Sequence, residues 1–333
     1  MRIASSRIVS AILVASILFA TTTMSTPASA EPKDNPTIFL FSGGLSDPFF
    51  GAIKKGADDA AKALGTTYQY LTITDRSDVM GNYTRLLEQS YARKPDVMIA
   101  SVFFPAAMDP IVTKGVADGV PTFFMNSGLT SWKKDGAIAY IGEEPFTVGK
   151  QAGDVMVKAG VKHALCINHV PGNPLLELRC DGLADALKAA GAKVQVLAIP
   201  AEQAQNPQAV LQAIKGVLQA TPTIDGIFTL GSAQSVNAIK ATDELGVTEK
   251  IFAGTTDISN LNLQLVQQKK LKFILDQQPY IQGFYAVVAA YQYARYRVFP
   301  IGQIVTSPFI ITPDNVDEIL AINKKYGGVR GAL

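Results

Sequence analysis

Residues 37–73 read TIFLFSGGLSDPFFGAIKKGADDAAKALGTTYQYLTI. The apolar run at 37–41 predicts a buried strand, and apolar residues at helical spacing predict a helix over 49–64. Residues 68–73 are strand-like again. Two strands separated by one helix are typical of a parallel βαβ unit, because parallel strands need a crossover connection between them. This stretch therefore predicts an α/β fold.

The same alternation of strands and helices continues along the chain. A helix is predicted over 79–91, and further strands are predicted at 97–100, 122–125, 164–167, 194–199, 227–230, 251–254 and 273–275. We therefore expect a parallel, doubly wound architecture, in which ligands bind beyond the carboxyl ends of the strands. A length of 333 residues indicates two domains, since domains usually hold about 100 to 200 residues.

The composition excludes several classes of protein. The chain is 17% charged and 48% hydrophobic, with 27 Gly and 18 Pro, which argues against disorder, collagen and coiled coil. Without Arg2 and Arg7 of the first thirty residues, 28 basic residues balance 28 acidic ones. Such a balanced chain has no basic stripe that could neutralise phosphates, so nucleic acid is not an expected partner.

The first thirty residues have the form of a secretory signal peptide. Arg2 and Arg7 make a positive start, 8–20 is an apolar run, and 28–30 is the small-residue sequence Ala-Ser-Ala. The apolar run is shorter than the roughly 20 residues that span a bilayer. We expect cleavage after Ala30 and an exported protein.

A polar and aromatic turn follows the first predicted strand. Asp47 can cap the following helix, and Pro48 suits its first position. Phe49 and Phe50 are adjacent and cannot both face one core, so one of them would be free to stack on a ligand. The alternative is a well-capped helix with two core aromatics.

Five short motifs, taken in order, resemble those of the periplasmic sugar-binding proteins related to ribose-binding and galactose-binding proteins. They lie at 47–50, at 120–127, at 172–174 with 177–183, at 254–257 and at 276–280. Each falls at a predicted strand end or helix start. The resemblance implies the type I periplasmic binding protein fold, which has two doubly wound parallel-sheet lobes, a three-strand hinge and a ligand between the lobes.

The resemblance also implies a set of ligand-binding residues at the matching positions. They are Asp47, Phe49, Phe50, Ser101, Asn126, Asn173, Arg179, Asp257 and Gln277. Carboxylates and amides can share hydrogen bonds with sugar hydroxyls, arginine can bridge two oxygens, and an aromatic ring can cover an apolar sugar face. Simpler alternatives stay open: an Asp after a strand can be a helix cap, and Arg179 can pair with Asp181 or Glu177 on its own helix.

Some residues depart from the family pattern. Asn126 and Ser127 stand where ribose-type proteins carry Asp-Arg, and Thr256 stands where an aromatic commonly precedes the Asp. We therefore expect a ligand that is not recognised as ribose is. No loop resembles the calcium site of galactose-binding proteins, so neither a metal nor a cofactor is expected. Roles are left open for His169, Gln205, Trp132 and the apolar pair Phe103-Phe104.

The two cysteines are fourteen residues apart. Cys166 lies in a predicted strand and Cys180 in the following helix. In an exported protein an even cysteine count favours a disulfide, although two buried thiols are the alternative. A disulfide would brace the turn that presents Asn173 and Arg179.

The family's three crossovers set the expected lobe boundaries. One lobe would hold residues 31–141 plus 277–305, and the other 142–276 plus 306–333. Closure of the lobes would trap a monosaccharide or polyol in the periplasm and present it to the membrane permease of an ABC importer. The protein would be a monomer and not an enzyme. A chemoreceptor or sensor kinase that reads the same surface is one alternative, and an exported glycosidase using Asp47 and Asp257 is a weaker one.

Overall fold

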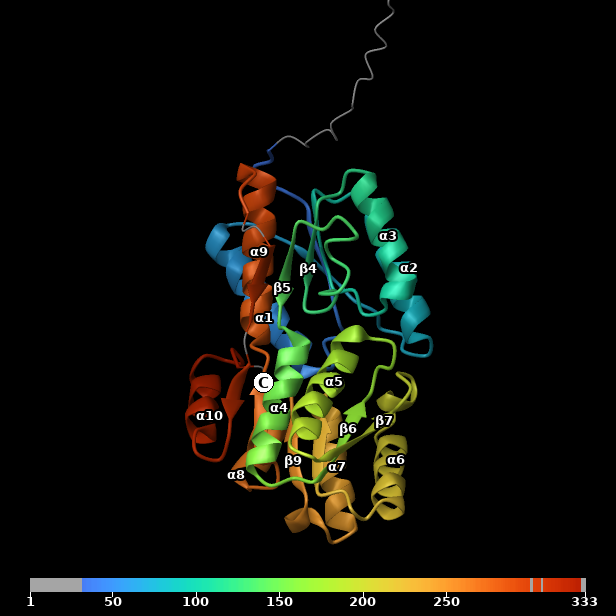
Figure 1. Cartoon of the computed structure of the whole chain (residues 1–333). Coiled ribbons are helices and arrows are strands. Elements are labelled where there is room, and N and C mark those ends of the chain that lie inside the picture. Colours follow the sequence, from blue (N-terminus) through green and yellow to red (C-terminus); the bar gives the residue numbers. More distant parts are fainter. Residues whose placement is uncertain (1–31, 300–301, 307, 331–333) are drawn as a thin grey trace, which may run out of the picture.

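The computed structural model describes residues 32–299, 302–306 and 308–330. Two six-stranded sheets flanked by helices form two lobes, one above the other (Figure 1). The first sheet has the order β11 (Gly302–Val305), β5 (Ala139–Gly142), β4 (Thr122–Met125), β3 (Val97–Ala100), β1 (Ile38–Phe41) and β2 (Gln69–Leu71). The second has the order β12 (Phe309–Ile311), β10 (Phe273–Asp276), β9 (Phe252–Thr255), β8 (Gly226–Thr229), β6 (His163–Asn168) and β7 (Lys193–Ala198).

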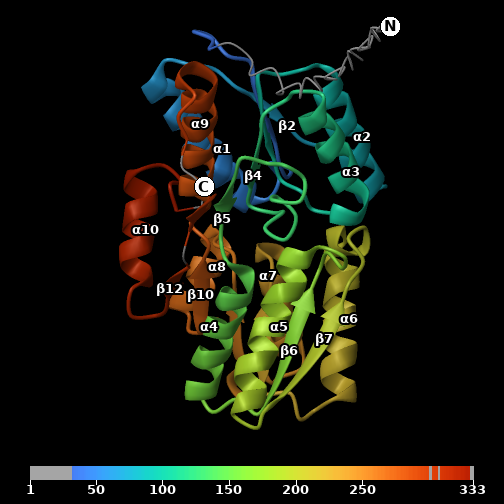
Figure 2. The same cartoon turned by 45° about the horizontal axis from the view of Figure 1, so that its top comes forward.

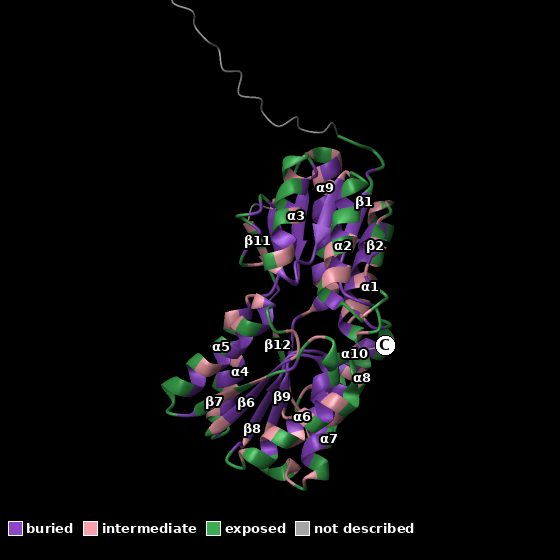
Figure 3. Cartoon of the chain, turned by 90° about the vertical axis from the view of Figure 1, so that its right-hand side faces the viewer, coloured by how far each residue is buried: buried purple, intermediate pink, exposed green. Residues whose placement is uncertain are grey.

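Helices cover both faces of each sheet. The first lobe contains α1 (Pro48–Leu64), α2 (Val79–Ala92), α3 (Pro105–Ala117) and α9 (Pro279–Tyr296). The second contains α4 (Pro145–Lys158), α5 (Pro174–Ala189), the short η1 (Gln203–Gln205), α6 (Pro207–Ala220), α7 (Ser232–Glu244), η2 (Thr248–Lys250), α8 (Asn260–Gln267) and α10 (Val316–Lys325). In Figure 3 the central strands are coloured as buried, whereas the helices also carry exposed faces. The edge strands β2, β7, β11 and β12 contain exposed residues as well. The predicted doubly wound α/β fold in two lobes is confirmed.

The start of the stretch 37–73 folds as its residues predict. All four residues of β1 are buried, as expected for a strand covered on both faces. The side chain of Asp47 caps α1, Pro48 occupies its first turn, and Gly65 ends it with a φ of 63°. A left-handed residue at that position suits glycine, which pays no steric cost there.

One strand runs against the others. The pairs within both sheets are parallel except that of β10 with β12, in which Asp276 lies opposite Phe309. The chain reaches β12 directly from β11 of the other lobe. It therefore enters the second sheet at the edge facing the first lobe, where β10 ends, and must run in the opposite direction. The sheets are therefore parallel, as predicted, apart from this edge strand, which was not predicted from the sequence.

The chain passes between the two sheets at three places. β5 of the first sheet is followed by α4 of the second lobe, β10 of the second sheet by α9 of the first lobe, and β11 by β12. The short connections are residues 143–144, 277–278 and 306–308. Figure 2 shows α4 leaving the end of β5 on the side where the lobes meet.

Glycines allow two helix pairs to pack closely. A Cβ atom on Gly149 of α4 would lie 2.0 Å from the carbonyl oxygen of Arg179 on α5, and one on Gly182 of α5 would lie 2.1 Å from that of Phe146. In the first lobe, a Cβ on Gly283 of α9 would lie 1.9 Å from the carbonyl oxygen of Ile53 on α1. The close approach of α4 and α5 holds the backbone of Arg179 against the helix that follows the first connection.

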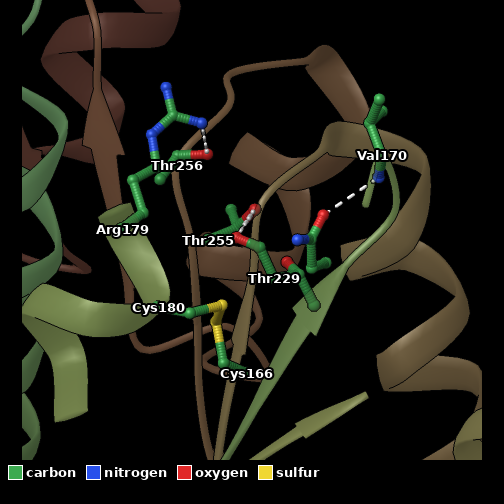
Figure 4. The surroundings of a disulfide bond; sticks show 8 residues. Cys166, Val170, Arg179, Cys180, Thr229, Thr255 and Thr256 are labelled. Carbon is green, nitrogen blue, oxygen red and sulfur yellow. Dashed lines mark hydrogen bonds between the residues drawn. A yellow bond between two sulfur atoms is a disulfide. The ribbon is translucent and has the colours of Figure 1, made fainter. Parts of the chain in front are cut away.

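The two cysteines form a disulfide. Cys166 of β6 and Cys180 of α5 are joined with their Cα atoms 5.8 Å apart (Figure 4), so the predicted pairing is present. Both cysteines are buried in the apolar core between β6 and α5. The disulfide therefore fixes the helix turn that carries Arg179 to the sheet.

Removing this disulfide should lower the free energy of unfolding by about 3 kcal/mol, because the bond closes a short loop in the unfolded chain. Urea denaturation of a Cys166→Ala, Cys180→Ala double variant, compared with the oxidised parent, measures the loss. The parent in excess reductant is the control, and it should unfold at nearly the same midpoint as the variant. Equal stabilities of variant and oxidised parent would contradict the prediction.

The expected signal peptide, residues 1–30, lies outside the described residues. Within the part of the chain that the structure describes, none of the helices has the length and apolar character needed to cross a membrane.

Candidate functional site

A cavity of about 510 Å³ lies between the lobes, beyond the carboxyl ends of the strands. It is lined by strand ends and helix starts of both sheets, as expected for a doubly wound fold. Apart from Ser101, every predicted ligand-binding residue lines it, namely Asp47, Phe49, Phe50, Asn126, Asn173, Arg179, Asp257 and Gln277.

Arg179 is the cationic centre of this cavity. Its side chain is almost completely buried, and its Nε donates to Oε1 of Glu143 at 2.6 Å, while Nη2 lies 2.6 Å from the same oxygen. Nη1 approaches Thr256 Oγ1 at 3.5 Å (Figure 4). Burial raises the pKa of Glu143, and Arg179 opposes that shift. The partner of Arg179 is thus Glu143 in the first connection, and not Asp181 or Glu177 of its own helix.

Asp257 follows β9 and faces the same cavity. Its Oδ1 accepts a hydrogen bond from Gln277 Nε2 and a longer one, 3.4 Å, from Thr256 Oγ1. Burial, followed by repulsion from the carboxylates of Asp47 and Glu143, raises the pKa of Asp257 to about 7. Asp257 therefore exchanges a proton near neutral pH and can offer a sugar hydroxyl either a donor or an acceptor.

Asp47 combines the two roles that the sequence left open. Its Oδ1 accepts the N–H of Phe49 at 3.0 Å and so caps α1, yet the residue also lines the cavity. Burial raises its pKa. Phe49 is buried in the core between β1 and α9, whereas Phe50 is only partly buried and meets Phe49 edge-on, with ring centroids 5.2 Å apart. A Cβ on Gly43 would lie 2.2 Å from the ring of Phe50, so this glycine makes room for the ring.

Three of the predicted residues contribute amide groups to the polar lining. Asn126 follows β4 with a left-handed φ of 64°. Asn173 caps α5, and its Oδ1 also lies 3.3 Å from Ser127 Oγ of the other lobe. Gln277 lies in the second connection, and its Oε1 has no hydrogen-bond partner among the described residues. Polar groups from both lobes thus converge on the cavity with capacity left for a ligand.

Ser101 is the predicted ligand-binding residue that does not line the cavity. It has no exposed surface, and its hydroxyl donates to the carbonyl oxygen of Met125 at 2.9 Å and lies 3.3 Å from Ser42 Oγ. A side chain this small, at the end of the central strand β3, reaches only the ends of neighbouring strands. Ser101 therefore joins β1, β3 and β4 behind the cavity wall.

The residues whose roles were left open from the sequence lie in two different pockets. His169, Gln205, Phe103 and Phe104 line the cavity, whereas Trp132 lines a separate small pocket. The Nδ1 atom of His169 has no hydrogen-bond partner among the described residues, and burial lowers the pKa of its ring to about 4, so the ring is neutral at pH 7.

Arg76 and Gln234 are among the cavity residues that were missed from the sequence, and they lie on opposite lobes. Arg76, between β2 and α2, donates to Gln205 Oε1 of the second lobe and to Ser46 Oγ of the first at 2.8 Å. Gln234, near the start of α7, also faces the cavity. Within the described ranges, no three His, Cys, Asp or Glu side chains gather in a way that could hold a metal ion.

Residues 38–297 match the periplasmic binding protein domain. The chain belongs to this family. The xylose/arabinose-binding protein of Sulfolobus acidocaldarius is 26% identical to this periplasmic binding protein over 316 residues, which cover 88% of this chain and 76% of that protein. The ribose import binding protein of Haemophilus influenzae is 22% identical over 269 residues, covering 80% and 88% of the two chains.

Solved structures of other members share its fold. A carbohydrate transporter of Acidothermus cellulolyticus in complex with myo-inositol superposes with a TM-score of 0.79 at 26% identity, over 89% of this periplasmic binding protein and all of that chain. A ribose ABC transporter protein of Conexibacter woesei has a TM-score of 0.73 at 20% identity, covering 86% and 95% of the two chains. The resemblance read from the five motifs and the type I fold that it implied are both confirmed.

Proposed function

We propose that this periplasmic binding protein is a solute receptor that binds a monosaccharide or polyol between its lobes and delivers it to an ABC import permease. One observation carries the proposal: carboxylates, amides and a guanidinium from both lobes converge on one cavity beside the ring of Phe50. Groups of these kinds match the hydroxyls and the apolar face of a sugar. The names of the relatives, which refer to xylose, arabinose and myo-inositol, support the same class of ligand.

The hinge that we propose consists of the three connections between the sheets. Arg179 is anchored by Glu143 in the first connection, and Gln277 belongs to the second. A ligand held by both side chains would act directly on the segments about which the lobes turn. Closure is then favoured to the extent that the ligand binds the closed form better than the open form. The lobes would hold 31–141 plus 277–305 and 142–276 plus 306–333.

We infer binding without catalysis. Oδ1 of Asp47 is engaged as a helix cap, and Asp257 is held by Gln277, so the two carboxylates act as hydrogen-bonding groups and not as a glycosidase pair. The family consists of binding proteins, which supports this inference. We propose a monomer in the periplasm, released from a signal peptide that ends at Ala30. A chemoreceptor or a sensor kinase is the alternative reader of the closed lobes.

A thermal-shift screen of the purified protein against pentoses, hexoses and polyols tests the proposal. A true ligand at 100 times its dissociation constant should stabilise the fold by about 2.7 kcal/mol. An Asn126→Ala variant should lose most of this shift, whereas Asn82→Ala, a change outside the cavity, should keep it. Chemical turnover of the bound sugar, or the absence of a shift across the panel, would contradict the proposal.

A further inference from the structure

The cavity has an apolar wall that the proposed sugar site does not use. We call it the apolar annex, and it consists of Val79, Tyr83, Phe103 and Phe104 of the first lobe with Val170 and Ala201 of the second. The four residues of the first lobe belong to a single hydrophobic cluster, against which Val170 and Ala201 pack across the gap between the lobes. The annex is therefore a continuous apolar surface contributed by both lobes.

A row of aromatic rings joins the annex to the proposed sugar site. The centroid of Phe50 lies 5.2 Å from that of Phe49 and 6.0 Å from that of Phe103, which lies 5.1 Å from that of Tyr83. Phe49 follows the cap residue Asp47 by two positions. These rings therefore connect the part of the cavity at Asp47 with the annex.

A polar contact between the lobes marks one side of the cavity. Arg76 donates to Gln205 Oε1 across the gap, and a Cβ on Gly44 would lie 2.4 Å from Arg76 Nη2, so this glycine makes room for the guanidinium. Both side chains line the cavity together with the annex. Arg76 and Gln205 therefore join the two lobes within the cavity lining.

The size and chemistry of the whole cavity fit a ligand with two parts. A volume of about 510 Å³ lies within the range of about 300 to 1,000 Å³ found for pockets of drug-sized ligands, which exceed a single sugar ring. Hydroxyls placed against the annex would lose their hydrogen bonds to water without gaining new ones, which is unfavourable. An apolar group placed there gains free energy from burial.

We propose that the ligand of this protein is a sugar or polyol that carries an aromatic or alkyl substituent, with the substituent in the annex. This inference rests on the proposed function and narrows its class of ligand. It assigns a binding role to Phe103-Phe104, which the proposed sugar site leaves without one.

Calorimetric titration of the purified protein with matched ligand pairs tests the inference. The pairs are D-xylose, L-arabinose and D-glucose, each with its phenyl glycosides of both anomers, and myo-inositol with its monobenzyl ethers. We expect the substituted member of the binding pair to bind at least about tenfold more tightly than the free sugar or polyol, because its ring becomes buried.

Two variants locate the substituent. Ala201→Trp fills the annex from a partly buried position, and Phe103→Ala removes a ring from its wall. Each variant should therefore bind the free and the substituted member of a pair with nearly equal dissociation constants. Ala198→Trp, an exposed position at the end of β7, is the matched control and should keep the ratio of the parent protein. If Phe103→Ala fails to fold, Ala201→Trp alone decides.

The outcomes separate the two proposals. If free sugars bind as tightly as their phenyl derivatives, or if the preference survives in Ala201→Trp, the annex proposal is overturned and the receptor proposal stands. If no member of any pair binds, the receptor proposal fails, and the annex proposal fails with it.

Discussion

Replacing Arg179 by alanine should weaken sugar binding by about 100-fold or more and also lower the free energy of unfolding by about 3 to 5 kcal/mol. Binding suffers because the fork of donors at the centre of the cavity is removed. Stability suffers because Glu143, which has no exposed surface, is left buried without its cation. An uncompensated buried charge is among the costliest defects that a single substitution can create.

Calorimetry and urea denaturation measure the two losses separately. A second change, Glu143→Gln in the Arg179→Ala background, removes the orphaned charge, so it should restore part of the stability and none of the binding. Arg85→Ala, at an exposed arginine of α2, is the matched control and should leave both quantities nearly unchanged. Sugar binding by Arg179→Ala at the affinity of the parent would show that this residue serves the fold alone.

Asp257→Asn should change how stability depends on pH. The folded protein raises the pKa of Asp257 from 3.8 to about 7, so between about pH 4 and pH 7 the folded state holds a proton that the unfolded state has released. The stability contributed by this proton is complete below about pH 4 and is lost as the pH rises to 7, at up to about 1.4 kcal/mol per pH unit. The amide of the variant is neutral at every pH and lacks this dependence.

The quantity to measure is the difference in unfolding free energy between parent and variant, from urea titrations at pH 4 to 8. The unfolding free energy of the variant should rise steadily relative to that of the parent from pH 4 to 7. The difference between the two should be constant above pH 7. His169, whose pKa is lowered to about 4, stabilises the fold increasingly as the pH rises from 4 to 6.5. This contribution of His169 is present in both parent and variant, so it largely cancels in the difference between their unfolding free energies. Parallel pH profiles would contradict the assignment of this proton to Asp257.

The sequence predicts the central strands well because burial on both faces leaves a clear apolar run. The strands predicted at 97–100 and 122–125 coincide with β3 and β4. Strands β11 and β12 were not predicted, since exposed residues interrupt both and their pairing depends on contacts made after the chain has crossed between lobes. Their existence is decided by tertiary structure and not by local pattern.

The cavity residues were predictable to the extent that each belongs to a short motif at a strand end. Glu143 was missed because the strand that it follows, β5, was itself not predicted. From the sequence, only Asp181 and Glu177 of the same helix were considered as partners of Arg179. The residue that pairs with it, Glu143, lies 36 residues earlier in the chain. The contact of Arg76 with Gln205 is missed for the same reason, since it joins residues 129 apart on different lobes.

The three passages of the chain between the lobes also determine when folding can finish during synthesis. The first sheet begins with β1 but lacks its edge strand until β11 has been made, and the second sheet lacks its own until β12 has been made. Helix α9, which packs on α1, also appears only after the second lobe is nearly finished. The growing chain therefore carries two incomplete sheets with open edges until almost all of it has been synthesised. Although domains generally fold one after another from the N-terminus, these two lobes must be completed together at the end.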